Sequence, residues 1–375
     1  MCKYIGVIIK MKKNKIIVFV KNKLITLDTV LPILIEMKEK YNITSKIVVF
    51  DDLAYKAIHK NIVIKDAVDY VGSVIYITRG SKSKILRIMS VIFYMLILFP
   101  GFIKGNKVLH FGHLSDGVLR LISILFSKNV YHLQGSAYDF NYSLKIFEEN
   151  NNIRAKQGGD NIVFFGKKIG EEYFSNVKCK KIFFFGETRT RLSWVSYIRN
   201  RSDYYFNLHH KSVDFSNGCV VYILGAIEAI DYKKRLFLNT VNILKSINLK
   251  IPILVKPHAF TEMKVVHNAI ENLPMAHITY LHPSLLATKS KLFISNNFSN
   301  TLADAHSFGV PTIQYSYYDN ASTEECKEKF VDYLVKDDIN EFNTIIRNIL
   351  SNDFNSSNFE GVDRSDDGLL LSLSS

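Results

Sequence analysis

The chain has 375 residues, long enough for two domains, and 47% of them are hydrophobic while 22% are charged. These fractions exclude a collagen, a coiled coil and a wholly disordered chain. The 48 Lys and Arg against 35 Asp and Glu give a net charge of +13. Such a balance indicates an anionic partner: nucleic acid, an acidic membrane surface or a phosphorylated substrate.

Short β-branched apolar runs predict seven strands in the first half of the chain, at 15–20, 46–50, 74–78, 108–111, 130–133, 161–165 and 181–185. Helical spacing of apolar residues predicts helices at 27–41 and 117–126. Strands that alternate with helices are typical of a parallel sheet covered by helices on both faces.

The same alternation restarts after a polar stretch at 199–217, which we interpret as a linker. The second half is predicted to contain strands at 219–224, 252–255, 291–295 and 311–314, and helices at 236–247, 300–308 and 338–350. We therefore expect an α/β chain with two facing, doubly wound, Rossmann-like domains and a cleft between them. Their expected bounds are 1–205 and 206–350, and a polar tail at 351–375 is expected to be disordered.

An almost uninterrupted apolar run covers residues 88–103 and has basic residues on both sides. These flanking residues are Lys82, Lys84, Arg87, Lys104 and Lys107. A membrane span needs about 20 apolar residues, and this run is shorter. The sequence leaves three alternatives: a buried core helix, a helix on a membrane surface whose basic flanks contact lipid phosphates, or a true span.

The four cysteines are scattered and form no C-x-x-C pair, so we expect neither a disulfide framework nor a structural metal site. The apolar run at the N-terminus is too short for a signal peptide, which favours a cytoplasmic protein. Lys and Arg are dispersed rather than gathered on one helix, so we expect no nucleic-acid partner. The glycine-rich fingerprints of P-loop and dinucleotide sites are also missing.

Ligands of open α/β sheets bind beyond the carboxyl ends of the strands, so these positions give the candidate site residues. In the second half they are Gly225, Glu228, Lys256, Pro257, His258, Ser295, Ser299, Asn300, Thr301 and Asp304. Lys256 and His258 can donate charge-assisted hydrogen bonds to a phosphate, and Ser299 to Thr301 stand at a predicted helix N-terminus. The alternatives are a satisfied surface histidine at His258 and ordinary N-capping at Ser299 or Asn300.

In the first half, the loop at 110–117 follows a predicted strand and offers two imidazoles, from His110 and His113, and the carboxylate of Asp116. Asp116 is either a catalytic base or an N-cap of the next helix. The next strand is followed by candidate acceptor-side residues Gln134, Gly135 and Ser136. A turn glycine is the alternative for Gly135.

The second half resembles the nucleotide-binding domain of bacterial GT-B glycosyltransferases, and more narrowly the sialyltransferase and polysialyltransferase group. The residues that carry this resemblance lie within 219–318: the strand that ends in Gly225 with Glu228 after it, Lys256-Pro257-His258, His282-Pro283, and Ser295 to Thr301 with Asp304. Enzymes that transfer Kdo from CMP-Kdo to capsule or lipopolysaccharide share the K-P-H and serine-rich pattern.

The resemblance implies that an H-P motif and a Ser/Thr-rich motif hold the phosphate of a CMP-sugar, and that a D/E-D/E-G motif supplies the base. Ala259 follows His258 and breaks the H-P pair there, whereas His282 and Pro283 keep it intact. The tripeptide Ser115-Asp116-Gly117 matches the base motif at two of its three positions. On this basis Asp116 and His258 are the expected catalytic residues.

The expected function is transfer of an acidic sugar, a sialic-acid-like nonulosonate or Kdo, from a CMP-activated donor to a glycan or glycolipid of capsule or lipopolysaccharide. We expect no cofactor and no metal, because CMP leaves as a monophosphate. Direct displacement would invert the anomeric carbon, and the sequence leaves a retaining reaction open. Association of residues 82–107 with the cytoplasmic face of the inner membrane is expected. Two alternatives stay open: a transferase that uses a UDP- or GDP-sugar, and a non-enzymatic basic module that binds nucleic acid or membrane.

Overall fold

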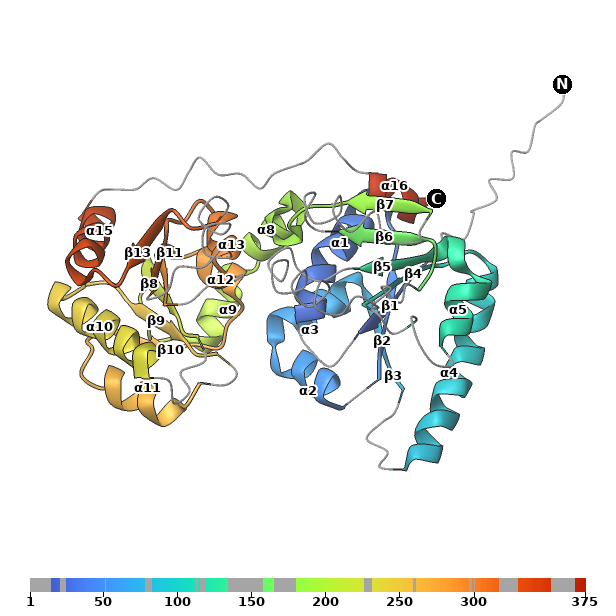
Figure 1. Ribbon diagram of the computed structural model, residues 1–375, viewed down its shortest axis with the longest axis horizontal. Coiled ribbons are helices and arrows are strands. Elements are labelled where there is room, and N and C mark those ends of the chain that lie inside the picture. Colours follow the sequence, from blue (N-terminus) through green and yellow to red (C-terminus); the bar gives the residue numbers. More distant parts are fainter. Residues whose placement is uncertain are drawn as a thin grey trace, which may run out of the picture.

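Two parallel sheets, each with helices on both faces, lie side by side along the long axis of the molecule (Figure 1). The computed structural model describes residues 15–20, 25–50, 52–77, 83–111, 114, 119–133, 158–164, 180–225, 231–258, 261–296, 299, 301–316, 330–351 and 368–375.

The first sheet has seven strands in the order β3-β2-β1-β4-β5-β6-β7, and every neighbouring pair is parallel. The strands are β1 (Ile16–Val20), β2 (Ser45–Val49), β3 (Gly72–Tyr76), β4 (Lys107–His110), β5 (Val130–Leu133), β6 (Asn161–Phe164) and β7 (Lys181–Phe184). The chain moves outward from β1 to β3 and then returns to the other side of β1 at β4. Because of that reversal, the topological switch point of this sheet lies between the neighbouring strands β1 and β4.

Alternation along β1 sends its side chains into two separate layers, because successive residues of a strand face opposite sides. Ile16 and Val18 belong to the apolar cluster beneath α1 (Ile25–Tyr41) and α3 (Ile62–Val71), while α2 (Asp52–Lys60) lies beside α3. Ile17 and Phe19 belong to a smaller cluster beneath α4 (Lys84–Ile103) and α5 (Arg120–Leu125).

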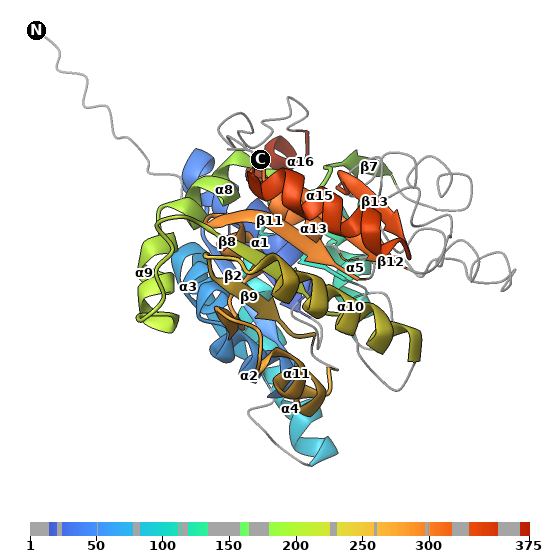
Figure 2. The ribbon, with the colours of Figure 1, turned by 90° about the vertical axis from the view of Figure 1, so that its left-hand side faces the viewer.

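The second sheet has six strands in the order β10-β9-β8-β11-β12-β13, again all parallel. The strands are β8 (Cys219–Ile223), β9 (Ile253–Lys256), β10 (Ala276–Ile278), β11 (Ser290–Ser295), β12 (Thr312–Ser316) and β13 (Tyr333–Lys336). Its outer face carries α10 (Asp231–Ile247), α11 (Met263–Ile270) and α15 (Ile339–Ser351), which are nearest the viewer in Figure 2. Its inner face carries α12 (Pro283–Ala287) and α13 (Thr301–His306).

The expected α/β class with two doubly wound parallel sheets is confirmed. Two strands were not predicted, β10 and β13, and both are edge strands of the second sheet. Edge strands bury less apolar surface than central ones, and β10 has only three residues, all partly exposed. They therefore lack the continuous apolar run that identified the central strands.

The stretch 199–217, which we interpret as a linker, contains helix α9 (Ser202–His209), and helix α8 (Leu192–Arg199) ends at its first residue. Tyr205 is fully buried, and its hydroxyl donates to Asp66 of α3 at 2.7 Å. Tyr205 and Phe206 form the buried side of α9, whereas Tyr204 is 59% exposed.

The expectation of a disordered tail is wrong for its last residues, which form α16 (Gly368–Ser374) beside β7 and α1 of the first domain (Figure 1). Leu369, Leu370 and Leu373 are buried there. The Tyr131 hydroxyl lies 2.7 Å from the Ser372 hydroxyl. The chain end therefore returns to the first sheet because its leucines complete the apolar cluster under α1.

Helix α4 is not the buried core helix that was one alternative for residues 88–103. Of its residues only Leu98 and Phe102 are fully buried, and just 11% of its most apolar stretch is inaccessible. Among the described helices it is the one long and apolar enough to cross a membrane. Lys107, which we expected to contact lipid, is partly buried and donates from Nζ to Asn129 at 3.2 Å.

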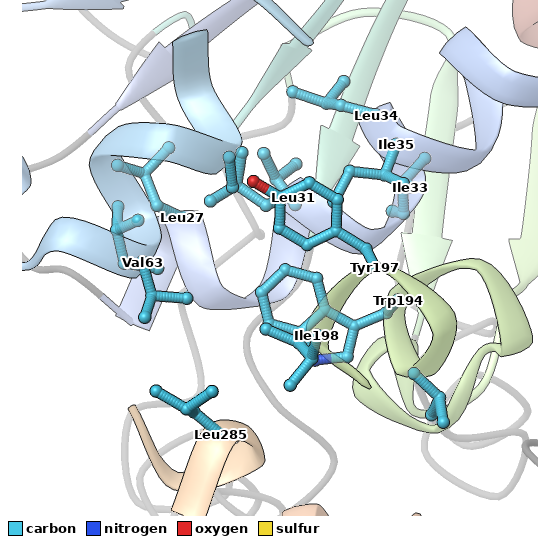
Figure 3. Close-up of a cluster of buried hydrophobic side chains, with 14 of the residues drawn as sticks. Leu27, Leu31, Ile33, Leu34, Ile35, Val63, Trp194, Tyr197, Ile198 and Leu285 are labelled. Atoms are coloured by element: carbon cyan, nitrogen blue, oxygen red, sulfur yellow. The ribbon is translucent and has the colours of Figure 1, made fainter. Parts of the chain in front are cut away.

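The two domains are joined through one apolar cluster that extends from α1 through α8 to α12 (Figure 3). Trp194 and Tyr197 of α8 stand between the side chains of α1 and Leu285 of α12. Beside them Arg191 donates two hydrogen bonds to Glu36 of α1, at 2.8 and 2.7 Å, and both side chains are 2% exposed. The two domains are therefore joined by a buried apolar interface that includes a bidentate ion pair between Arg191 and Glu36.

Glu36→Gln is expected to lower the free energy of unfolding by about 3 kcal/mol, because it leaves the buried Arg191 guanidinium without a carboxylate. The measurement is urea unfolding at pH 7. Asp69→Asn serves as the matched control, since it breaks the exposed Lys65–Asp69 pair at 3.9 Å and should cost under about 1 kcal/mol. Equal effects of the two substitutions would contradict a structural role for the buried pair.

Candidate functional site

The strand order of the second sheet reverses between β8 and β11, its two central strands. Ligands of open α/β sheets bind in the crevice outside the carboxyl ends of the strands at such a reversal. The residues that follow these strands are Leu224 and Gly225 after β8 and Asn296 after β11. Lys256 ends the neighbouring strand β9. Gly225, Lys256 and Ser295, which the sequence predicted, thus lie at one edge of one sheet.

Lys256 is a partly buried cation at this edge. Burial lowers its pKa to about 8, and the nearby carboxylates of Asp28 and Asp304 oppose that fall. Among the described residues, its ammonium makes no hydrogen bond and has no carboxylate within ion-pair distance. A desolvated cation without a close partner is an unfavourable element of a fold, and it is suited to receive an anion.

The loops after β8 and β9 are tied together by Thr261. Its hydroxyl accepts from the backbone N–H of His258 at 2.9 Å and donates to the carbonyl of Gly225 at 3.1 Å. Pro257 is buried and the His258 residue is exposed. This arrangement holds the K-P-H segment in one conformation and leaves the His258 side chain at the surface of the loop.

Asn296, the first residue after β11 and one that sequence analysis passed over, is held by several hydrogen bonds. Its amide donates to Thr240 at 3.0 Å and to the carbonyl of Tyr315 at 3.2 Å, while the Tyr222 hydroxyl donates to its oxygen. Ser295 is buried beside it. These hydrogen bonds give Asn296 a structural role at the end of β11.

N-capping by Ser299 is present: its hydroxyl accepts from the Thr301 N–H at 3.3 Å and lies 2.7 Å from the Thr301 hydroxyl. Contact of Ser299 or Thr301 with a phosphate stays a prediction. Asn300 and Glu228 lie outside the described residues.

Asp304 is fully buried, and both of its carboxylate oxygens are occupied. Arg189 donates to one at 2.7 Å and the Ser284 hydroxyl donates to the other. Burial raises the pKa of Asp304, against the lowering effect of the Arg189 guanidinium. Trp194 completes the chain by donating from its indole N–H to Ser284 at 2.9 Å. Direct contact of Asp304 with a ligand would require one of these partners to give way.

His282 begins α12 as its N-cap, and Pro283 occupies the first helical position, where a proline lacks nothing that the helix needs. Its Nδ1 accepts from the Ser284 N–H at 3.2 Å. Its Nε2 faces Asp28 Oδ1 of α1 at 3.5 Å, and both atoms are buried without a hydrogen-bond partner among the described residues. This close approach brings the first turn of α1 to the strand ends of the second sheet.

Asp28, Arg189 and Ser284 are site residues that sequence analysis missed. Asp28 stands in the first turn of the helix that follows β1, at the switch point of the first sheet. The strand-end rule that selected Lys256 would have selected Asp28 as well. Arg189 and Ser284 have no local signal, because their importance comes from contacts with residues about 115 and 20 positions away.

The first-half candidates His113, Asp116, Gln134, Gly135 and Ser136 lie outside the described residues. The nearby His110 does not present its imidazole to the cleft, as we had expected. It is fully buried, stacks on His132 at 4.7 Å, donates from Nε2 to the Gly158 carbonyl at 2.9 Å and accepts from the Leu114 N–H at 3.4 Å. His110 is therefore a structural residue that holds the end of β4.

Two hollows on the surface of the second domain lie away from these candidate residues. The larger one has a volume of about 900 Å³ and is lined by residues of α9, α11 and the edge strand β10. Neither it nor its smaller neighbour contains any of the strand-end residues. Within the described ranges, no cluster of three or more His, Cys, Asp or Glu side chains could hold a metal ion.

The chain matches no protein-family model and no curated protein. Its structure does align with many solved structures. The UDP-GlcNAc 2-epimerase of Methanocaldococcus jannaschii, in complex with UDP-GlcNAc and UDP, aligns over 96% of this chain and 99% of its own, with a TM-score of 0.58 and 17% identity.

UGT2 of Phytolacca americana, complexed with UDP-2-fluoro-glucose and pterostilbene, aligns over 91% of both chains, with a TM-score of 0.53 and 8% identity. A glycosyltransferase of Rickettsia africae aligns over 97% of this chain and 95% of its own, with a TM-score of 0.51 and 13% identity. At identities this low, the structural alignments establish a common fold and nothing finer. They confirm the GT-B arrangement of two Rossmann-like domains.

Lys256→Met is expected to raise the free energy of unfolding at pH 7 by about 2–3 kcal/mol, because it removes a charge that the fold desolvates. The folded-state pKa of Lys256 lies below its unfolded value, so between pH 8 and 10.5 the unfolded chain binds more protons and the wild type gains stability as the pH rises. The advantage of the variant should therefore shrink toward pH 10.

Chemical denaturation of both chains at pH 7, 8, 9 and 10 measures this difference. Lys291→Met, at an exposed residue of β11, is the control and should stay within about 0.5 kcal/mol of wild type at every pH. Destabilisation by Lys256→Met at pH 7 would contradict the description of Lys256 as an unfavourably buried cation.

Proposed function

We propose that this chain is a nucleotide-sugar-dependent glycosyltransferase whose donor is a UDP-sugar, bound at the carboxyl ends of β8, β9 and β11. One observation carries the proposal: Lys256 is a partly buried ammonium, without an ion-pair partner among the described residues, beside the switch point of the second sheet of a GT-B fold. A phosphate placed against it would restore the interactions that burial has removed.

The surroundings of Lys256 are suited to a ligand that contains a diphosphate. Gly225 follows β8 without a side chain to obstruct approach, and the exposed His258 lies two residues beyond Lys256. Asp28 and Asp304 lie close enough to act on the Lys256 charge, so the site is not a simple basic patch. An anion held there would have its phosphate on Lys256 and its polar sugar or ribose groups toward the carboxylates.

The structural neighbours support UDP over CMP as the nucleotide. The epimerase of M. jannaschii holds UDP-GlcNAc and UDP, and UGT2 of P. americana holds UDP-2-fluoro-glucose. Nothing in the comparisons supports the sialyltransferase group. The broken H-P pair at His258 and Ala259 is consistent with this, as is the structural role of His282 as a helix cap.

In the proposed reaction the acceptor hydroxyl attacks the anomeric carbon of the donor sugar. Its proton passes to a carboxylate of the first domain, for which Asp116 is our candidate, and the bond from the anomeric carbon to the phosphate oxygen breaks. The departing UDP carries away the bonding electrons as negative charge. Lys256 and His258 stabilise that charge as it develops, which lowers the barrier for departure.

Epimerisation of a UDP-sugar is the second candidate function. The M. jannaschii epimerase aligns with a higher TM-score than UGT2 and the R. africae glycosyltransferase, 0.58 against 0.53 and 0.51, and over 99% of its own length. An epimerase of this kind inverts one carbon of the sugar and needs no acceptor. The two functions therefore differ in whether a second substrate is consumed.

UDP is expected to raise the melting temperature of the protein, whereas CMP and GDP at equal concentration should raise it less, because a ligand that binds only the folded state stabilises it. Lys256→Ala should weaken UDP binding at least tenfold, as expected for loss of a charge-assisted contact. UDP affinity should also fall about tenfold per pH unit above pH 8 as the ammonium deprotonates. Lys256→Arg should remove that pH dependence, since a guanidinium stays charged.

Isothermal titration at pH 7, 8 and 9 measures these affinities. Lys211→Ala, at an exposed residue of the segment between α9 and β8, is the matched control and should bind UDP as the wild type does. Preferential stabilisation by CMP would return the donor to the CMP-sugar class. UDP affinity unchanged by Lys256→Ala would remove Lys256 from the site.

Incubation with UDP-GlcNAc is expected to release UDP only when a glycan or glycolipid acceptor is present, with no epimerised sugar nucleotide in its absence. Asp116→Asn should lower kcat by about 100-fold or more while leaving the Kd for UDP unchanged, because a base acts on the acceptor. Proton NMR of the sugar nucleotide and a UDP-release assay read the two outcomes. Formation of an epimer without acceptor would establish the second candidate function instead.

A further inference from the structure

Helix α4 is apolar around its whole circumference. Its inner side, formed by Val91, Tyr94, Met95, Leu98 and Phe102, packs on the first sheet. The residues of its outer side are 43–71% exposed: Ile85, Leu86, Ile88, Met89, Ile92, Phe93, Leu96, Ile97, Phe99 and Ile103. A surface helix of a water-soluble domain normally has polar residues on this side.

Helix α5 extends the same apolar surface. It lies beside α4 on the outside of the first sheet (Figure 1), where the ring of Phe126 lies 5.6 Å from those of Phe99 and Phe102. Leu121, Ile124 and Leu125 of α5 are 57–66% exposed. We name these three residues and the ten of α4 the α4–α5 face. Its exposed apolar area is on the order of 1,000 Å², above the 300–600 Å² typical of the largest patch on a soluble monomer.

The segment that carries the α4–α5 face is strongly basic. Between residues 71 and 138 the sequence holds a single acidic residue, Asp116, and eight basic ones. Of the basic residues, Arg87, Lys104, Arg120 and Lys128 are described and exposed, near the ends of α4 and α5. The face is therefore an apolar surface with a basic rim.

The fold limits how this surface can meet a membrane. Helix α4 connects β3 to β4, and both strands belong to the same sheet. A bilayer-spanning α4 would place these two strands on opposite sides of the membrane and divide the sheet. The helix can therefore lie along a membrane surface and insert its outer side, but it cannot cross the bilayer while the first domain is folded.

We propose that the α4–α5 face docks on the surface of an anionic lipid bilayer, with its apolar side chains among the acyl chains and its basic rim on the lipid phosphates. Apolar side chains next to Lys and Arg are the combination that binds such surfaces. A second copy of this chain is a poorer occupant, because face-to-face pairing would set two basic rims against each other. The proposal does not depend on the donor or on the reaction.

Co-sedimentation with vesicles tests the docking. The wild type is expected to sediment with phosphatidylethanolamine/phosphatidylglycerol (7:3) vesicles and at least tenfold less with phosphatidylcholine vesicles. Ile92→Glu/Leu96→Glu, which places two charges on the face, should lower the partition coefficient at least tenfold. Leu53→Glu is the matched control, since Leu53 is 71% exposed on α2, away from the face, and it should bind as the wild type does.

Charge reversal on the rim separates the electrostatic part. Lys104→Glu/Lys128→Glu should weaken binding to the anionic vesicles and lower its dependence on salt. Insertion is read from Phe93→Trp with lipids brominated in the acyl chain, because the one native tryptophan, Trp194, is fully buried. The introduced indole should be quenched by these lipids, and the fluorescence of the wild type should change little.

Three results would overturn the proposal. One is absence of wild-type binding to any vesicle. Another is a wild-type dimer in light scattering that Ile92→Glu/Leu96→Glu converts to a monomer, which would assign the face to a second copy. The third is loss of vesicle binding in Leu53→Glu equal to that in the face variant. Retention of the UDP-induced thermal shift by Ile92→Glu/Leu96→Glu verifies its fold, and circular dichroism does so if UDP does not bind.

Discussion

The buried ion pair between Arg189 and Asp304 determines how the two halves of the site meet. Asp304 is fully buried in the second domain, and Arg189 belongs to the segment that leaves the first sheet. Taking both charges out of water is costly, and the attraction between them offsets that cost only in good geometry with the remaining atoms bonded. Ser284 donates to the second oxygen of Asp304, and Trp194 donates in turn to Ser284. The pair therefore acts chiefly as a geometric lock on the interface.

That lock has a consequence for Lys256. With Asp304 held by Arg189 and Ser284, neither of its oxygens is available to neutralise the ammonium, and Asp28 is directed toward His282 instead. Lys256 interacts electrostatically with both carboxylates but forms an ion pair with neither. The fold thus keeps a cation at a strand end in a state that an incoming phosphate improves. Residues that a fold stabilises poorly are the ones most easily explained by a ligand.

The sequence predicted what depends on local pattern and missed what depends on distant contacts. Central strands such as β1 and β8 appear as apolar runs because both faces are covered, and Lys256 was found because it ends such a run. Arg189 and Ser284 carry no periodicity, and only the packing of the Thr188–Thr190 segment and of α12 against α13 makes them partners of Asp304. The exposure of α4 could not be predicted from the sequence either, because an apolar helix has the same sequence pattern whether protein or lipid covers it.

The direction of the strands connects the two proposals. In a parallel sheet all carboxyl ends lie at one edge, and β3, β4 and β5 are parallel members of one sheet. Helix α4 begins after β3, and the loops that contain Asp116 and Gln134 begin after β4 and β5. The first turns of α4 and the carboxyl ends of β4 and β5 therefore share an edge of the first domain. A bilayer against the α4–α5 face would lie near that edge, which favours an acceptor carried by a lipid over one free in solution.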